Sequence, residues 1–227
     1  MPNCPISLIQ WLKGGQHREA QTALKRFADT HKVNIFHDDV LKKAQAEHAL
    51  QRWFGDSAGN SQYCFIGAHG IKGETGTAIG IGASDNPGEF VTWGELWKWF
   101  VQGHLMGGLW LGACESSDAA VALSPSLTGC VGPAIPYIYG FSESIHSKEI
   151  EKILLKLIEF TRIENFPYLP EELGLIRAAV PGSKIEMFYP ACTLSGTKEY
   201  VNVDWMLEKT GLTFRELLER KRSPHSC

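Results

Sequence analysis

The chain has 227 residues, 44% of them hydrophobic and 21% charged, with 25 acidic side chains against 22 basic ones. These fractions are typical of globular proteins and exclude a disordered or low-complexity chain. The formal net charge of −3 gives no electrostatic basis for binding nucleic acid, so we expect no nucleic-acid partner.

The sequence also lacks the marks of a membrane or secreted protein. Its apolar runs are shorter than the roughly 20 residues that a membrane-spanning helix needs, and its first residues lack the basic region of a signal peptide. Its six cysteines include no C-x-x-C pair, which argues against a zinc site and against a dense disulfide framework. We therefore expect a cytoplasmic protein with reduced thiols, no membrane association and no metal site.

Helix-like and strand-like segments alternate along the chain. Apolar residues at helical spacing predict a helix over 16–31, a β-branched run predicts a strand over 33–36, and a second helix follows over about 40–54. The apolar run 63–68 has the length of a strand buried on both faces. The later predicted elements are a short strand at 77–82 within the Gly-rich segment 71–90, a helix at 93–102, a strand at 109–113, a short helix at 118–123, a strand at 136–141, helices at 147–161 and 170–179, a strand near 185–189, a hairpin near 193–203 and a helix at about 204–221.

This alternation predicts a mostly parallel central sheet with helices on both faces, which is a three-layer α/β/α sandwich. The chain contains no internal repeat and no linker long enough to separate two domains, so we expect one domain over residues 1–227. Within that domain we expect an N-terminal helical extension over about 1–31 and a C-terminal hairpin and helix over about 185–227.

Two of the predicted strands end in residues that can perform chemistry. The first runs into His69-Gly70, and the second runs into Cys114, Glu115 and two serines. Open α/β sheets place their sites just beyond the carboxyl ends of strands, and the small residues before Cys114 allow a sharp turn whose backbone N–H groups can bind an oxyanion. A thiol with the usual pKa of about 8.5 needs an imidazole to activate it, so we interpret Cys114 as a nucleophile and His69 as its base. We expect Glu115 to cap or orient the helix that follows.

The order of these two residues argues against two familiar classes of enzyme. Papain-like proteases have the cysteine first and the histidine far downstream, and α/β-hydrolases also place the histidine after the nucleophile. Here His69 lies 45 residues before Cys114, and only His146 and His225 come later. The order is that of caspases, in which the histidine lies roughly 50 residues upstream of the cysteine.

The two motifs resemble the signatures of the CHAT family, which comprises caspase-like cysteine peptidases related to caspases and separase. In that family one strand ends in His-Gly, as residues 68–70 do here, and a later strand ends in Ala-Cys-Glu-Ser, as residues 113–116 do here. Residues 139–142 (Tyr-Gly-Phe-Ser) also resemble the strand and loop that follow the nucleophile and line the P1 pocket of the family. The resemblance covers about residues 33–161.

The resemblance implies a caspase-like fold and a cysteine endopeptidase that hydrolyses peptide bonds through a thioester at Cys114, with no metal or organic cofactor. His69 would act as general acid and base, and the backbone N–H groups of Gly70 and Cys114 would form the oxyanion hole. The Gly-rich segment 71–90 would act as a mobile flap over the cleft. The partner would be a protein or peptide substrate. Because the chain lacks the repeat or sensor regions of many CHAT proteins, any regulator of this effector protease would be a separate polypeptide.

The candidates for the substrate pocket are Ser142, Glu143 and Asp85. Residues 112–115 (Gly-Ala-Cys-Glu) differ from the Gln-Ala-Cys motif of caspases, so the resemblance does not imply specificity for Asp. An acidic pocket side chain, from Glu143 or Asp85, would select Lys or Arg through charge-assisted hydrogen bonds. Lys72 or Lys148 would equally favour acidic substrate residues.

Two other functions are compatible with the same residues. A catalytically silent caspase-like interaction module would keep the fold, and its Cys114 would be buried and unreactive. A thiol amidase or acyl-transfer enzyme would use His69 and Cys114 on small amides instead of peptides.

Overall fold

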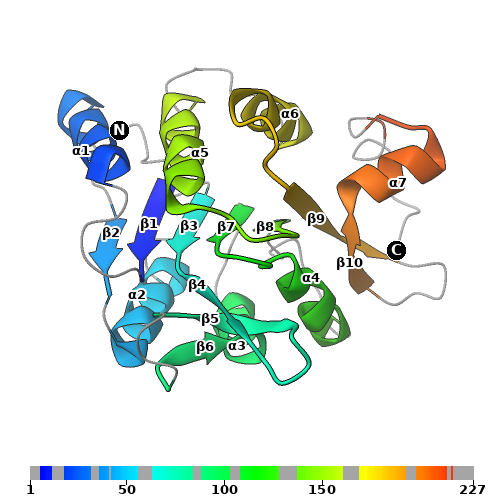
Figure 1. Cartoon of the computed structure of the whole chain (residues 1–227), viewed down its shortest axis with the longest axis horizontal. Helices are drawn as coiled ribbons and strands as arrows, with labels where there is room; N and C mark the ends of the chain where they lie inside the picture. Colours follow the sequence, from blue (N-terminus) through cyan, green and yellow to red (C-terminus); the bar gives the residue numbers. More distant parts are fainter. Residues whose placement is uncertain are drawn as a thin grey trace.

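A seven-stranded sheet forms the centre of the fold in this computed structural model (Figure 1). The structure describes residues 6–11, 18–31, 36–40, 42–55, 63–83, 88–102, 108–127, 137–160, 169–192, 198–213 and 216. The strands are β1 (Ile6–Gln10), β2 (Phe36–Asp39), β3 (Tyr63–Gly67), β7 (Gly108–Gly112), β8 (Tyr137–Phe141), β9 (Ile185–Cys192) and β10 (Lys198–Asn202), in the order β10-β9-β8-β7-β3-β1-β2. The five strands from β2 to β8 pair in parallel, and β9 and β10 pair antiparallel.

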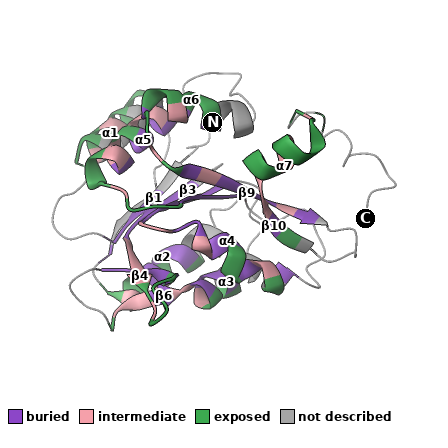
Figure 2. Cartoon of the chain, turned by 45° about the vertical axis from the view of Figure 1, so that its right-hand side comes forward, coloured by how far each residue is buried: buried purple, intermediate pink, exposed green. Residues whose placement is uncertain are grey.

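Helices cover both faces of this sheet. One face carries α1 (Arg18–His31), α5 (Ser147–Phe160) and α6 (Leu169–Ala179), and the other carries α2 (Lys43–Gly55), α3 (Trp93–Gln102) and α4 (Asp118–Leu123), which a 3-10 turn over Ser124–Leu127 extends. Figure 2 shows the buried sheet between these two helical layers. The predicted α/β class, with a mostly parallel sheet and helices on both faces, is therefore confirmed.

A second, smaller sheet lies on the side of α2 and α3 (Figure 1). It contains β4 (His69–Lys72), β5 (Ala78–Gly82) and β6 (Phe90–Thr92), all antiparallel and in sequence order. The strand expected at 77–82 is confirmed as β5. Because a single residue, Ala68, separates the end of β3 from the start of β4, the small sheet starts at the carboxyl edge of the large one.

The core of the large sheet follows from strict alternation along its inner strands. In β7, Leu109 and Leu111 pack with α2, α3 and α4, whereas Trp110 packs with α5 and α6. Phe65 of β3 and Tyr139 of β8 flank Trp110 on the same face, with all three rings close to parallel. Strands buried on both faces have apolar residues at every position, which explains the continuous apolar runs in the sequence.

The expected helical extension over 1–31 is wrong in its first part. Residues Ile6–Gln10 form β1, which lies between β2 and β3 inside the sheet. Leu8 and Ile9 are buried on opposite faces of the sheet, in the two different core clusters. A run of five residues has no periodicity that separates a strand from a coil, so its pairing with distant strands decides its structure. The helix expected at 16–31 is present as α1.

The C-terminal hairpin extends the sheet, and the helix after it is shorter than expected. The strands β9 and β10 pair antiparallel, and β9 joins β8. Helix α7 (Val203–Thr210) packs against both. It begins at Asn202, whose side chain accepts hydrogen bonds from the N–H groups of Asp204 and Trp205. It ends at Gly211, whose left-handed backbone (φ 63°) closes the last turn instead of continuing the helix to 221.

The start of α3 gives a pH-dependent prediction. Thr92 and Glu95 form a reciprocal capping box, and Lys43 of α2 pairs with Glu95 at 2.6 Å. Burial by itself would raise the pKa of Glu95, but the hydrogen bonds from Lys43 and Thr92 outweigh it and hold that pKa below its usual value. A lowered folded-state pKa stabilises the fold above the unfolded-state pKa, and this contribution is lost as the pH falls through the folded-state pKa.

We therefore expect Glu95→Gln to lower the Tm at pH near 7, and we expect this Tm difference to shrink as the pH falls through the lowered pKa of Glu95. Thermal melts followed by circular dichroism across this range measure the difference. A Tm difference that stays constant with pH would show that the carboxylate charge contributes nothing.

Candidate active site

His69 and Cys114 occupy matching places at the ends of two neighbouring strands. The parallel strands β3 and β7 pair in a register that sets Gly67 opposite Gly112. The N–H of Ala68 donates to the carbonyl oxygen of Gly112 at 3.1 Å, which extends this pairing by one residue. His69 and Cys114 each follow two residues after the paired glycines. The fold therefore brings the two motifs together at one edge of the sheet.

Gly70 lies directly against the backbone of Cys114. A Cβ atom built on Gly70 would lie 2.1 Å from the carbonyl oxygen of Cys114, closer than any side chain can approach. Only glycine fits this position without moving β4 or the turn. His69, next to Gly70, is partly buried.

The sulfur of Cys114 contacts the loop that follows β8. The N–H of Ile145 donates to Sγ at 3.4 Å, and the thiol lies 3.7 Å from the carbonyl oxygen of the same residue. Cys114 is partly exposed, whereas Cys64 in β3 is fully buried. The buried cysteine expected for a silent interaction module is therefore not found at position 114.

The residue after the cysteine has an unusual backbone and an ion pair. Glu115 has φ 54°, in the left-handed region that side chains disfavour, and its N–H donates to the carbonyl oxygen of Glu143 at 3.2 Å. Its carboxylate accepts a hydrogen bond from Lys72 of β4 at 2.6 Å. This hydrogen bond raises the pKa of Lys72 above its usual value. Glu115 is thus not a helix cap, because α4 begins only at Asp118 and its N-cap is Ser117.

The two serines of the motif fasten the turn to β8. The buried hydroxyl of Ser116 donates to the carbonyl oxygen of Leu111 at 2.7 Å and accepts from the N–H of Phe141 at 3.1 Å. The N–H of Ser117 donates to the carbonyl oxygen of Phe141 at 3.1 Å. A Cβ atom on Gly140 would meet the N of Ser117 at 2.6 Å, so the two segments are in close backbone contact. Sequence reasoning missed the role of Ser116, because its partner Phe141 lies 25 residues further along the chain.

The hairpin of β4 and β5 is fastened to the same turn. The N–H of Ala78 in β5 donates to the carboxylate of Asp118 at 2.9 Å. Together with the Lys72–Glu115 pair, this bond joins the small sheet to the residues that follow Cys114. The Gly-rich segment expected to form a flap thus includes a hairpin with two polar attachments beside the cysteine, and its mobility stays a prediction.

Of the expected pocket residues, two lie in the loop that contacts the sulfur. Ser142 and Glu143 directly follow β8, a few residues before Ile145, and both are exposed. The N–H and hydroxyl of Ser142 contact the carbonyl oxygen of Lys184 at 3.1 and 3.5 Å. Asp85 lies outside the described residues.

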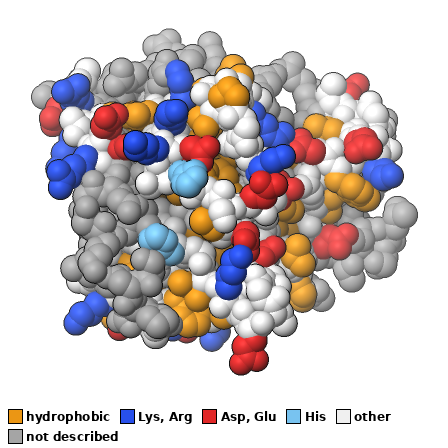
Figure 3. All heavy atoms as spheres, in the orientation of Figure 1, with side chains coloured by type: hydrophobic (Ala, Val, Ile, Leu, Met, Phe, Trp, Pro, Cys, Tyr) orange, Lys and Arg blue, Asp and Glu red, His pale blue; other side chains and the backbone are white. Residues whose placement is uncertain are grey.

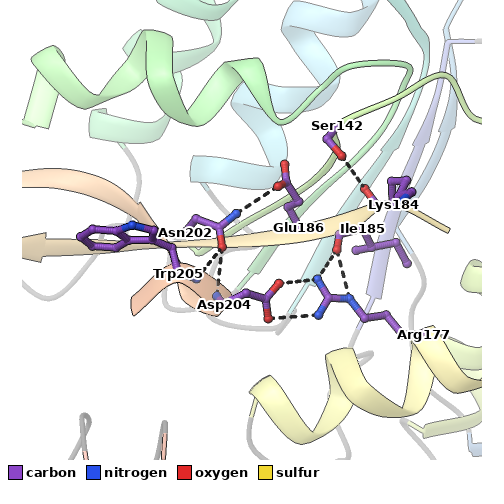
Figure 4. A network of polar contacts seen from close by, with 8 residues as sticks. All are labelled: Ser142, Arg177, Lys184, Ile185, Glu186, Asn202, Asp204 and Trp205. Atoms are coloured by element: carbon purple, nitrogen blue, oxygen red, sulfur yellow. Dashed lines mark hydrogen bonds and ion pairs between the residues drawn. The ribbon is translucent and has the colours of Figure 1, made fainter. Parts of the chain in front are cut away.

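The far side of this loop is anchored to the C-terminal part of the fold. Figure 4 shows the hydroxyl of Ser142 directed at the carbonyl oxygen of Lys184, and the next residue, Ile185, lies between this contact and the guanidinium of Arg177 in α6. Arg177 donates to the carbonyl oxygen of Ile185 and to both carboxylate oxygens of Asp204 in α7. The loop after β8 is therefore held between the cysteine on one side and the network around β9 on the other.

The surface charge, the metal-ligating side chains and the helices of the described residues complete the description of the site. Acidic and basic side chains are interspersed on the face in Figure 3, with no extended patch of one sign among the described residues. Within the ranges described, no three His, Cys, Asp or Glu side chains gather as a metal site would require. No described helix is both long and apolar enough to cross a membrane.

Comparison with known proteins adds no family to this description. A scan against protein-family models and a search of curated proteins each returned no match to the chain. The fold and the site define it as a mixed α/β protein with a histidine and a partly exposed cysteine at the ends of adjacent parallel strands.

Proposed function

We propose that the chain is a cysteine endopeptidase of the caspase-like CHAT type, with Cys114 as nucleophile and His69 as general acid and base. The observation that carries the proposal is the pairing of Gly67 in β3 with Gly112 in β7. Because the two strands are parallel, His69 and Cys114 follow these glycines at the same edge of the sheet. The partial exposure of Cys114 adds support, because a nucleophile must be reachable by substrate. The caspase-like version of the α/β/α sandwich is part of this proposal.

The proposed reaction needs only these residues and water. The thiolate of Cys114 attacks the carbonyl carbon of the scissile peptide, and the N–H groups of Gly70 and Cys114 stabilise the negative oxygen of the tetrahedral intermediate. His69 donates a proton to the leaving amine, which leaves a thioester on Cys114. His69 then takes a proton from a water that attacks the thioester, and the acid product and free thiol are released. Loss of either side chain removes a proton carrier or the nucleophile itself.

The first test measures whether the thiol and the imidazole act as a pair. We expect iodoacetamide to alkylate Cys114 at pH near 6 about 10- to 100-fold more slowly in His69→Ala than in the wild type. The physical reason is that a thiol with the reference pKa of about 8.5 is less than about 1% thiolate at that pH, whereas an imidazolium partner holds the thiolate form. Peptide mass spectrometry measures the rate at each cysteine separately.

The chain contains its own controls for this experiment. Cys64 is fully buried in β3 and should stay unlabelled in the folded protein, which checks that neither variant has opened. Equal rates at Cys114 in the wild type and in His69→Ala would contradict the proposed pair and favour an interaction module. A fluorogenic peptide library tested beside small primary amides then separates an endopeptidase from an amidase, with Cys114→Ala as the inactive reference.

The regulation and partners of such an enzyme stay predictions. A protein or peptide substrate follows from endopeptidase chemistry, and a separate regulatory polypeptide follows from the resemblance alone. In the substrate pocket, Glu143 is the described acidic candidate for selecting Lys or Arg, and its backbone contact with Glu115 keeps it near the cysteine.

A further inference from the structure

We propose that the ion pair between Lys72 and Glu115 is the positioning device of this site, holding the strand that carries His69 against the turn that carries Cys114. This inference rests on the proposed function and deepens it. Both are positioning residues, because they act through His69 and Cys114 and not on the substrate.

The first argument is the place of the pair in the chain. Lys72 lies three residues after His69 on β4, and Glu115 follows Cys114 directly. Their Nζ and Oε1 atoms are 2.6 Å apart. Together with the contact between Gly70 and the Cys114 carbonyl, the pair gives β4 two attachment points on the turn. Together with the bond from Ala78 of β5 to Asp118, these contacts set both the position and the direction of β4 on the turn.

The second argument is that β4 is not paired with a strand of the large sheet. This strand belongs to the small sheet and lies at its edge, where β5 is its described neighbour. The β4–β5 ladder also shifts register between Ile71 and Lys72. Ile71 pairs with Gly80 and Lys72 pairs with Ala78, so the additional residue at this shift, Ile79, belongs to β5. The regular pairing of β4 with β5 is thus interrupted at the residue that reaches across to Glu115.

The third argument is the backbone of Glu115. A residue with a side chain rarely adopts φ 54°, and glycine or asparagine is the usual choice at such a position. Strained residues persist where the surrounding structure holds them, and they gather at functional sites. Here the N–H of Glu115 is held by the carbonyl of Glu143, and its carboxylate is held by Lys72. Glycine would adopt this backbone conformation without strain, yet the chain has a glutamate at position 115.

The fourth argument is the charge beside the thiol. Glu115 places a negative charge next to a cysteine that must ionise, and a like charge nearby disfavours the thiolate. Lys72 compensates that charge. The pKa of Lys72 is raised first by the hydrogen bond to Glu115, and attraction to Cys114 and Asp118 adds to this, so the ammonium stays charged beside the turn.

The test compares Cys114 alkylation by iodoacetamide at pH near 6 in full-length variants. We expect Lys72→Met and Glu115→Gln each to slow the reaction about 10-fold, and Lys72→Arg to keep most of the wild-type rate. Glu115→Gly suits the left-handed backbone but lacks the carboxylate, and we expect it to be slow as well. The Tm of each variant should change little, because exposed ion pairs contribute little to stability.

The chain offers a matched control for the loss of an ion pair. Lys43 and Glu95 also pair at 2.6 Å, with side chains about one third exposed, and they join α2 to α3 instead of joining the parts of the site. We expect Lys43→Met to leave the alkylation rate of Cys114 unchanged. An equal slowing in Lys43→Met would overturn the inference, because the effect would then be a general loss of stability.

Two results separate this inference from the proposed function. If His69→Ala slows alkylation but Lys72→Met and Glu115→Gln do not, the dyad stands and the positioning role falls. If Glu115→Gln or Glu115→Gly reacts as fast as the wild type or faster, the carboxylate is only an unfavourable charge and the inference is wrong. If His69→Ala has no effect, the proposed function and the positioning role fall together.

Discussion

Replacing Gly70 with alanine is expected to reduce peptide hydrolysis about 100-fold or more, and to slow alkylation of Cys114 to the rate of His69→Ala. The added Cβ would lie 2.1 Å from the carbonyl oxygen of Cys114, and both sides of this contact are backbone. Neither can yield as a flexible side chain would, so β4 must move away from the turn. A displacement of about 1 Å between catalytic groups costs about 100-fold in rate.

The control is the same substitution at Gly94 in α3. A Cβ there meets no atom within 4 Å, and the position is exposed and helical. We expect Gly94→Ala to leave hydrolysis and alkylation unchanged and to raise stability by up to about 1 kcal/mol, because alanine favours the helix. Fluorogenic substrates from the peptide library and mass spectrometry of the alkylated protein measure both variants. Wild-type activity in Gly70→Ala would show that the contact between β4 and the turn is not required.

Trp110→Ala is expected to lower the free energy of unfolding by about 3–5 kcal/mol. Trp110 is completely buried at the centre of β7, and its ring stacks on Tyr139 with centroids 4.1 Å apart and planes within 3°. Phe65 flanks its other side at 6.4 Å. Removing the indole leaves a cavity in the face covered by α5 and α6, where rigid neighbouring strands prevent collapse.

Urea denaturation measures the free energy of unfolding of each variant, and two further variants serve as comparisons. Trp205 in α7 is 55% exposed, so Trp205→Ala should change stability by less than about 1 kcal/mol. The Nε1 of Trp110 has no hydrogen-bond partner among the described residues, so Trp110→Phe removes a buried unpaired donor and should cost less than Trp110→Ala. If Trp110→Ala lowered the free energy of unfolding no more than Trp205→Ala does, the result would contradict the stacked core.

Part of the site could be predicted from sequence because its signals are local. Residues 63–67 and 108–112 are continuous apolar runs of strand length, and each is followed within two residues by a group that can perform chemistry. Parallel strands end at the same edge of a sheet, so the runs also predict that His69 and Cys114 lie at one edge. Their direct adjacency depends on the pairing of β3 with β7, which the runs do not specify.

The attachments around the cysteine could not be predicted in the same way. Lys72 and Glu115 are 43 residues apart, Ala78 and Asp118 are 40 apart, and Ser116 and Phe141 are 25 apart. A charged or polar side chain in a loop is usually solvated, so its local sequence does not predict which distant residue it contacts. The neighbours of Glu115 in the sequence predict the start of a helix there, yet its backbone is left-handed and its carboxylate faces β4.

The sequence by itself determined the inner strands β3, β7 and β8, the class of fold that they build, and that a histidine and a cysteine follow two of those strands. The reason is that burial on two faces and the geometry of parallel strands leave a pattern within a few residues. Only the tertiary structure decided that Ile6–Gln10 is an inner strand and that Lys72 and Glu115 join β4 to the nucleophile turn. Those features depend on hydrogen bonds and charges between distant segments, whose partners are set by packing of the whole chain.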